Sequence, residues 1–170
     1  MAKKPSKSRH AVKKAAPKKA SGRNVKPAKA VAAQHNDDNL AFLKDYYKKW
    51  GETKGGNFEE IIQNLADDVV WRSIANGLQG LNFAKEPLTK PAVRGYFENL
   101  FRDWELVFFD VERFIGQGNS VVVLAECSFR HRRTGKSFMS PKADVWDFRR
   151  GKVVGYCEFF DTASAIRSAL

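Results

Sequence analysis

Cysteine is scarce in this 170-residue chain, and histidine is nearly as rare. The two cysteines, Cys127 and Cys157, cannot build the several crosslinks of a disulfide scaffold, and neither belongs to a CxxC or Cys/His cluster with the spacing of a zinc site. We therefore expect a reducing compartment, and we predict neither a metal site nor a cofactor.

Long apolar runs are absent as well. No stretch approaches the roughly 18 apolar residues that a membrane span requires, and the N-terminus lacks the apolar segment of a secretory signal. The sequence thus predicts a soluble, cytoplasmic protein without a membrane partner.

Acidic and aromatic residues are missing from the first 36 positions, which hold 11 Lys and Arg. This segment carries the whole net charge of +11, because the remaining residues balance 19 basic against 19 acidic side chains. A segment made largely of Lys, Ala, Pro and Ser buries too little apolar area to offset the entropy cost of ordering. We predict that residues 1–36 are a disordered basic tail and that residues 37–170 form one domain.

The basic tail has the composition of a polyanion-binding segment. Its lysines would attract nucleic acid through the release of counterions, without sequence preference, and would place the protein on a nucleoid or in a nucleus. Alternatively, the tail is a solubilising or targeting leader. The lysines concerned are Lys3, Lys4, Lys13, Lys14, Lys18 and Lys19.

Three segments of the domain have the apolar spacing of amphipathic helices. The first begins at polar N-cap candidates in 36–39 and ends at residue 51, the second covers 58–65, and the third covers 89–104. The buried face of the first is expected to comprise Leu40, Leu43, Tyr47 and Trp50. A strand is expected over 69–74, between the second and third helices.

Four β-rich runs follow the third helix, separated by short polar turns. They cover 105–115, 119–133, 136–149 and 152–161, and they predict an antiparallel meander, with a short helix over 162–170 after it. Helices gathered before a long antiparallel sheet indicate the α+β class. Residues 76–88 are more apolar than a solvated loop needs, so they either form a lid over a pocket or pack into the core.

Three stretches of the domain carry a family resemblance. They cover residues 65–71, 143–154 and 158–161. Over residues 38–165 the chain resembles the nuclear transport factor two-like superfamily, and within it the SnoaL-like proteins and ketosteroid isomerase. The resemblance implies a cone-shaped, strongly curved antiparallel sheet, with the three helices packed over its concave face around a pocket. It also implies a homodimer formed through the convex face.

The resemblance also implies candidate catalytic residues. Asp144 matches the acid of the isomerase oxyanion hole, and either Tyr46 or Tyr47 would supply the tyrosine donor. The general-base position falls at Ser73, and an unassisted serine does not replace a carboxylate, so we do not expect ketosteroid-type isomerisation. The resemblance also implies that Glu158 faces the same pocket, where it would act as a substitute base. The other interpretation of Glu158 is a structural salt bridge to Lys142 or Arg94.

Strand alternation and the resemblance together predict the lining of the pocket. The lining is expected to comprise Tyr46, Trp71, Ser73, Phe97, Cys127, Phe129, Lys142, Trp146, Tyr156 and Phe160, together with the candidate catalytic residues Asp144, Tyr47 and Glu158. His131 adjoins three arginines at a hairpin end and is predicted to be an exposed turn residue.

Two functions remain open from the sequence. The first is a SnoaL-like domain that binds a small, largely apolar ligand in its conical pocket, as an isomerase-, cyclase- or hydratase-type enzyme of unassigned reaction. The second is a non-enzymatic dimeric module whose basic tail attaches it to nucleic acid or to an acidic partner.

Overall fold

The computed structural model describes residues 28–85 and 88–170. The predicted disorder and polyanion binding of the basic tail fall mostly on residues 1–27, which lie outside the described residues. The domain begins with helix α1, Ala28–Glu52, which starts before the N-cap candidates of 36–39. The predicted helix start was therefore wrong, because an Ala-rich segment of high helix propensity precedes those polar residues and continues the helix through them.

The predicted face of α1 is confirmed, since Leu43, Tyr47 and Trp50 are buried and Leu40 is partly buried. Helix α2, Phe58–Asn64, and helix α3, Lys90–Asp103, follow as expected, with Thr89 at the N-cap of α3. Trp104 does not end α3 as predicted. It begins the next strand, where its extended backbone follows the last helical turn.

The sheet has five strands, in the order β1, β5, β4, β3, β2. Their bounds are Leu65–Ser73 for β1, Trp104–Gln117 for β2, Ser120–His131 for β3, Ser137–Arg149 for β4 and Lys152–Phe160 for β5. The predicted meander of β2 to β5 is confirmed, and helix α4, Thr162–Ala169, follows it.

Strand β1 departs from the prediction in two respects. It begins at Leu65, which pairs with Val153, rather than at residue 69. It also runs parallel to β5, so one edge of the otherwise antiparallel sheet is a parallel pair. Parallel neighbours need a long crossover, and here helix α3 and the whole meander supply it.

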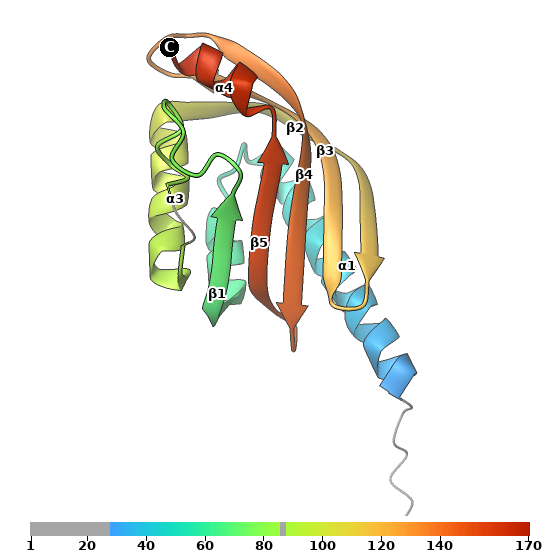
Figure 1. Ribbon diagram of the computed structural model, residues 1–170. Helices are drawn as coiled ribbons and strands as arrows, with labels where there is room; N and C mark the ends of the chain where they lie inside the picture. Colours follow the sequence, from blue (N-terminus) through green and yellow to red (C-terminus); the bar gives the residue numbers. More distant parts are fainter. Residues whose placement is uncertain (1–27, 86–87) are drawn as a thin grey trace, which may run out of the picture.

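The sheet is curled, and helices α1 and α3 lie on one side of it (Figure 1). Alternate residues of β3 and β4 point to this inner side and are buried, as Val121, Val123, Trp146 and Phe148 illustrate. The predicted α+β architecture is therefore confirmed, with a sheet that is curved but not closed.

The loop after β1 settles one open alternative. Leu81, Phe83 and Ala84 are buried in the core, whereas Leu78 is exposed. Leu81, Phe83 and Ala84 thus pack into the core, and Leu81 and Phe83 also help to wall the cavity described below.

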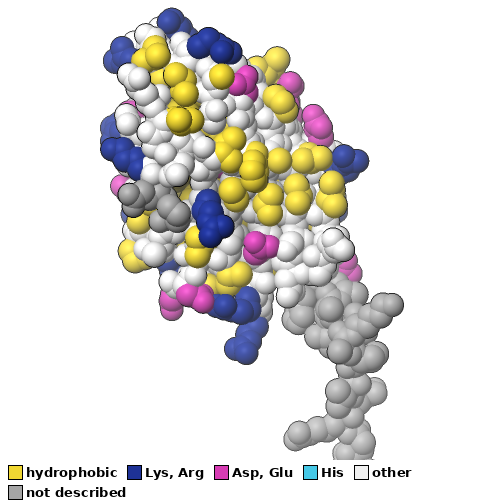
Figure 2. All heavy atoms as spheres, viewed as in Figure 1, with side chains coloured by type: hydrophobic (Ala, Val, Ile, Leu, Met, Phe, Trp, Pro, Cys, Tyr) yellow, Lys and Arg dark blue, Asp and Glu magenta, His cyan; other side chains and the backbone are white. Residues whose placement is uncertain are grey.

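The outer side of the sheet carries a band of apolar side chains across several strands (Figure 2). Val70, Ile115 and Phe159 are 39%, 45% and 43% exposed, and Val70 lines a hollow on this side together with the half-buried Val145 and Val154. An exposed apolar band of this kind, here called the outer apolar band, is typical of an interaction surface.

Candidate functional site

A small cavity of about 50 Å³ lies between the inner side of the sheet and the helices. Every residue predicted to line a pocket, apart from Ser73, contributes to its wall. These residues are Tyr46, Tyr47, Trp71, Phe97, Cys127, Phe129, Lys142, Asp144, Trp146, Tyr156, Glu158 and Phe160. They come from α1, α3 and four strands, so the curvature of the sheet is what brings them together.

The acidic centre of the cavity is a pair of carboxylates. Asp144 on β4 lies directly opposite Glu158 on β5, and the two residues are only 2% and 4% exposed. Lys142 lies on the same face of β4, two residues before Asp144, and its side chain is 9% exposed. Its ammonium is 3.0 Å from Oδ1 of Asp144 and also contacts Oε2 of Glu158. Two facing carboxylates would repel each other, and Lys142 offsets this repulsion.

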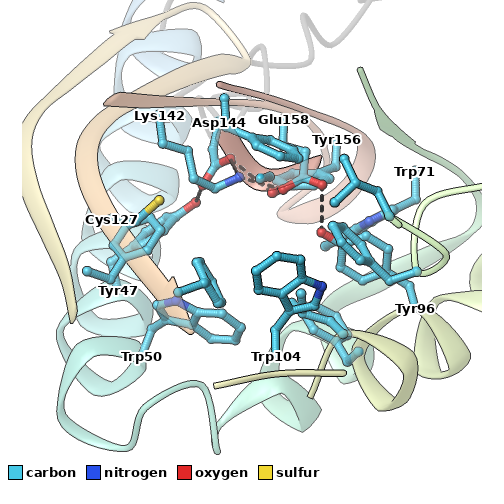
Figure 3. A pocket seen from close by; sticks show the side chains of 18 of the residues that line it. Tyr47, Trp50, Trp71, Tyr96, Trp104, Cys127, Lys142, Asp144, Tyr156 and Glu158 are labelled. Carbon is cyan, nitrogen blue, oxygen red and sulfur yellow. Dashed lines mark hydrogen bonds and ion pairs between the residues drawn. The ribbon is translucent and has the colours of Figure 1, made fainter. Parts of the chain in front are cut away.

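Three tyrosines donate hydrogen bonds to this carboxylate pair (Figure 3). The hydroxyl of Tyr47 is 2.5 Å from Oδ2 of Asp144, and that of Tyr156 is 2.9 Å from Oδ1. The hydroxyl of Tyr96 is 2.8 Å from Oε1 of Glu158. In each of these contacts a tyrosine hydroxyl donates to a carboxylate oxygen.

Burial and neighbouring charges shift the pKa values of Asp144, Lys142 and Tyr47. It raises the pKa of Asp144 above its ordinary value, although Lys142 partly offsets this effect. Burial alone would lower the pKa of Lys142, but Asp144 and Glu158 together raise it above its ordinary value. Burial, and then the charge of Asp144, raise the pKa of Tyr47 well above its ordinary value, so Tyr47 keeps its proton and remains a donor.

Aromatic rings form the rest of the wall. Trp71 stacks on Tyr156 with ring centroids 3.9 Å apart, and Trp146 packs edge-on against Trp71 at 5.7 Å. The indole Nε1 of Trp146 donates to the Tyr47 hydroxyl at 3.0 Å, which fixes the orientation of that tyrosine. The cavity is therefore apolar except at the carboxylate pair and its donors.

Several sequence-based alternatives are now resolved. Tyr47, and not Tyr46, makes the hydrogen bond to Asp144, although both line the cavity. Glu158 contacts Lys142, as one interpretation required, whereas Arg94 pairs with Glu59.

Two predictions about single residues were wrong. Ser73 is absent from the cavity wall, and its Oγ accepts a hydrogen bond from the backbone N–H of Ala75 at 3.1 Å, which turns it toward the following loop. His131 is not exposed: it is 7% exposed and packs edge-on against Trp104, with ring centroids 4.7 Å apart. The hairpin end folds back over the start of β2, where Arg132 N–H bonds to the Asp103 carbonyl.

Tyr96, Trp50 and Trp104 line the cavity but were not among the predicted pocket residues. Trp50 and Trp104 carried a signal, because both stood at apolar positions of the predicted helices. Tyr96 precedes Phe97 on α3, and its turn toward the cavity depends on how that helix packs against β1, which the sequence pattern does not reveal.

Among residues 28–85 and 88–170, no three His, Cys, Asp or Glu side chains are grouped so as to hold a metal ion. None of the described helices is both long and apolar enough to cross a membrane.

Solved structures with the same fold include two NTF2-like proteins. That of Burkholderia thailandensis is 23% identical, with a TM-score of 0.61, and the match covers 82% of this chain and 97% of that one. That of Burkholderia xenovorans is 20% identical, with a TM-score of 0.66 and coverage of 79% and 98%. TerC, crystallised with polyporic acid, is 19% identical, with a TM-score of 0.63 and coverage of 78% and 98%. No curated protein matches the chain.

A domain family matches the chain directly. The profile of the SnoaL-like domain covers residues 43–156, which include α1 from Leu43 and the strands as far as Tyr156 on β5. The matched region contains Tyr47, Lys142 and Asp144, and the structural likenesses above show the NTF2-like fold around them. The chain therefore belongs to the SnoaL-like domain family and has the NTF2-like fold.

Proposed function

We propose that this domain binds a small, largely apolar ligand in the cavity and moves a proton on it, as isomerase-, cyclase- and hydratase-type enzymes do. The observation that carries the proposal is the buried Asp144 and Glu158 pair with its single neighbouring ammonium, Lys142, in an otherwise aromatic cavity. Buried, mutually perturbing ionisable groups that line a cavity are typical of acid–base sites.

Glu158 is the group that we expect to take the proton. It pairs with Ser73 across β1 and β5, so a carboxylate stands one strand away from the position where the resemblance implies a base. Accepting a ligand proton converts the Glu158 carboxylate to the neutral acid and leaves the electron pair on the ligand. The ammonium of Lys142 is placed to stabilise the resulting anion.

Asp144 and Tyr47 are expected to anchor the ligand. Tyr47 receives the Trp146 N–H and donates to Asp144, so a proton gained by Asp144 would free the Tyr47 hydroxyl to donate to a ligand oxygen. The related TerC, crystallised with polyporic acid, supports small-molecule binding in this fold.

Ligand screening by thermal shift tests the binding step. Wild type would be compared with Asp144→Ala and Trp146→Ala, with Asp147→Ala on the exposed side of β4 as the matched control. We expect compounds that stabilise wild type and the control but not the two cavity variants. Identical responses in all four proteins would overturn the proposed site.

Deuterium exchange tests the proton transfer. A ligand found in the screen would be incubated with the protein in D₂O, and the loss of its exchangeable C–H signals would be followed by NMR. Exchange should be catalysed by wild type and lost in Glu158→Gln. If the ligand binds but no exchange is catalysed, the domain only carries the ligand, and the enzymatic part of the proposal is overturned.

We further propose that the domain forms a homodimer through the outer apolar band. The band includes the exposed Val70, Ile115 and Phe159, and its burial against a second copy would remove this apolar surface from water. Sedimentation should show a dimer that Phe159→Asp and Val145→Asp dissociate. Leu78→Asp, at an exposed loop residue off the sheet, should leave it intact, and a monomeric wild type would overturn this interface.

A second candidate function, attachment to a polyanion, is favoured by the charge distribution. Residues 1–36 contain the whole excess of +11, and residues 1–27 can be deleted without cutting into α1. Wild type should bind random duplex DNA with an affinity that falls steeply as salt is added, and the deleted form should not bind. Equal binding by the deleted form would rule out the tail as the binding segment.

A further inference from the structure

The cavity is too small for an apolar molecule of even the size of benzene. Its volume is about 50 Å³. An apolar cavity that binds benzene in a protein has a volume of about 150 Å³. A ligand therefore fits only after some part of the wall has moved outward, and the parts of the wall differ in how firmly they are held.

Most of the wall is held by strong interactions. Tyr47 of α1 donates to Asp144, and Tyr96 of α3 donates to Glu158, so both helices are hydrogen-bonded to the sheet inside the cavity. Leu81, in the loop after β1, is fully buried. Moving these walls would break hydrogen bonds to buried carboxylates or expose a large apolar side chain to water, and both are costly.

Helix α4 is the exception. It contributes Ala165 to the wall, and the other side chains that it buries, Ser168 and Ala169, are also small. Its one large apolar side chain, Ile166, is only partly buried. Figure 1 shows α4 lying across one end of the curled sheet, joined to it by β5. Because the burial of small side chains stabilises little, α4 is the part of the wall that leaves the cavity most easily.

Two hydrogen bonds hold the C-terminal end of α4 to the hairpin between β3 and β4. The hydroxyl of Thr134 donates to the carbonyl of Ser168, and the guanidinium of Arg133 donates to the carbonyl of Ala169, both at 2.6 Å. Carbonyls in the last turn of a helix have no partner within the helix, so the hairpin supplies one. The other end of α4 is continuous with β5 through Asp161, which caps the helix.

We propose that α4 is a lid, hinged at Asp161 and latched by Arg133 and Thr134, which opens to admit a ligand to the cavity. This inference rests on the proposed function, and it adds the route by which the site is reached. Opening breaks the two hydrogen bonds of the latch and removes Ala165 from the wall, while the carboxylate pair and its tyrosine donors stay in place. The structure described above is then the closed state of the domain.

Cys127 is a natural reporter of this opening. It lines the cavity, is 1% exposed and belongs to β3 rather than to the lid (Figure 3). The thiol reagent N-ethylmaleimide is larger than benzene, so it reaches Cys127 only when the wall opens. The reaction would be followed by mass spectrometry in the full chain carrying Cys157→Ser, which removes the second thiol. This parent protein needs no ligand for the measurement.

Weakening the latch should speed the labelling of Cys127. We expect Thr134→Val and Arg133→Met each to raise the rate roughly threefold to tenfold, since each removes one hydrogen bond from the closed state. Thr134→Ser keeps the hydroxyl and should label at the rate of the parent. Arg167→Met, which removes an exposed side chain bonded to Ser164 within α4, should also label at that rate.

Urea separates lid opening from unfolding of the whole domain. Freeing one eight-residue helix exposes little surface, so the labelling rate of Cys127 should rise only slightly with low concentrations of urea. Hydrogen exchange of the same samples should show the amides of α4 exchanging faster than those of β3. The α4 amides should also share the weak urea dependence of the labelling.

Two results would overturn the lid while leaving the proposed function standing. One is labelling of Cys127 with the steep urea dependence of the β3 amides, because the reagent would then enter only through unfolding of the whole domain. The other is a labelling rate that Thr134→Val and Arg133→Met leave unchanged. Conversely, if α4 opens as expected but no compound in the thermal-shift screen binds, the proposed function is contradicted and the movement of α4 is not.

Discussion

The ammonium of Lys142 lies 3.0 Å from the carboxylate of Asp144, and both groups are withdrawn from water in the same cavity. Among the described residues that line the cavity, Lys142 is the only Lys or Arg, yet two carboxylates depend on it. The cavity therefore holds more negative than positive groups, and its stability depends on one side chain.

Removing that side chain should be costly. Lys142→Met leaves Asp144 and Glu158 buried and facing each other, so we expect a loss of about 3–5 kcal/mol in the free energy of unfolding, measured with urea. Lys90→Met, which breaks an exposed bridge to Asp67, should cost less than about 1 kcal/mol. Adding Glu158→Gln to Lys142→Met should restore part of the loss, and a merely additive double variant would contradict the pairing.

Stability should fall with rising pH where Asp144 titrates. Because burial raises its pKa above the ordinary 3.8, the folded protein holds a proton that the unfolded chain has already released. Raising the pH through this window then lowers the free energy of unfolding of wild type relative to Asp144→Asn, by at most about 1.4 kcal/mol per pH unit. Urea titrations from about pH 4 to about pH 7 measure the difference.

A control of opposite sign is available on the surface. The pKa of Asp67 is lowered by its hydrogen bond and charge interaction with Lys90, so the stabilisation it provides is present at neutral pH and lost on acidification. Wild type compared with Asp67→Asn should therefore gain stability as the pH rises. The same sign for both residues would contradict the burial argument for Asp144.

The two cysteines should differ in reactivity. Burial raises the pKa of Cys127 to about 12, so almost none of it is thiolate near pH 8, whereas Cys157 lies half-buried at the hollow on the outer side of the sheet. A thiol reagent should label the Cys127→Ser variant well before the Cys157→Ser variant. In denaturant both should react at similar rates, and equal rates in the folded state would count against the burial of Cys127.

Gly55 should tolerate alanine less well than Gly118. Both have positive φ, +84° and +61°, so alanine is strained at either site by about 1 kcal/mol. A Cβ at Gly55 would also come within 2.1 Å of the Phe101 ring, which packs against Trp50, whereas nothing lies near one at Gly118. We expect Gly55→Ala to cost at least about 1 kcal/mol more in thermal or urea unfolding, and equal costs would refute the close contact.

Much of this fold could be predicted because its signals are local. The periodicity of Leu43, Tyr47 and Trp50 specifies a helix face, and polar turns between β-rich runs specify the meander. Alternation along β4 then places Lys142 and Asp144 on one side of the sheet. The parallel pairing of β1 with β5 has no local signal, because it joins segments far apart in the chain.

The sequence predicted most of the residues that form the candidate site, but not the contacts between them. Alternation put Glu158 toward the cavity, but only the register of β4 and β5 shows that it faces Asp144. Ser73 matched the resemblance and yet turns away, since the N–H of Ala75 at the strand end competes for its hydroxyl. The hydrogen bonds of Arg133 and Thr134 to α4 are a three-dimensional fact that no sequence pattern encodes.

The parallel pairing of β1 with β5 means that the sheet cannot form fully until the last strand has been synthesised. Strand β1 is synthesised early, but its neighbour β5 comes near the end of the chain. During translation, the stacking of Trp71 on Tyr156 and the ion pair of Lys142 with Glu158 therefore cannot form until β5 has been made. Contacts this distant in sequence also slow the search for the native state. A nascent or truncated product that ends before β5 lacks Tyr156, Glu158 and Phe160, so it carries the other aromatic residues of the cavity without the cavity itself.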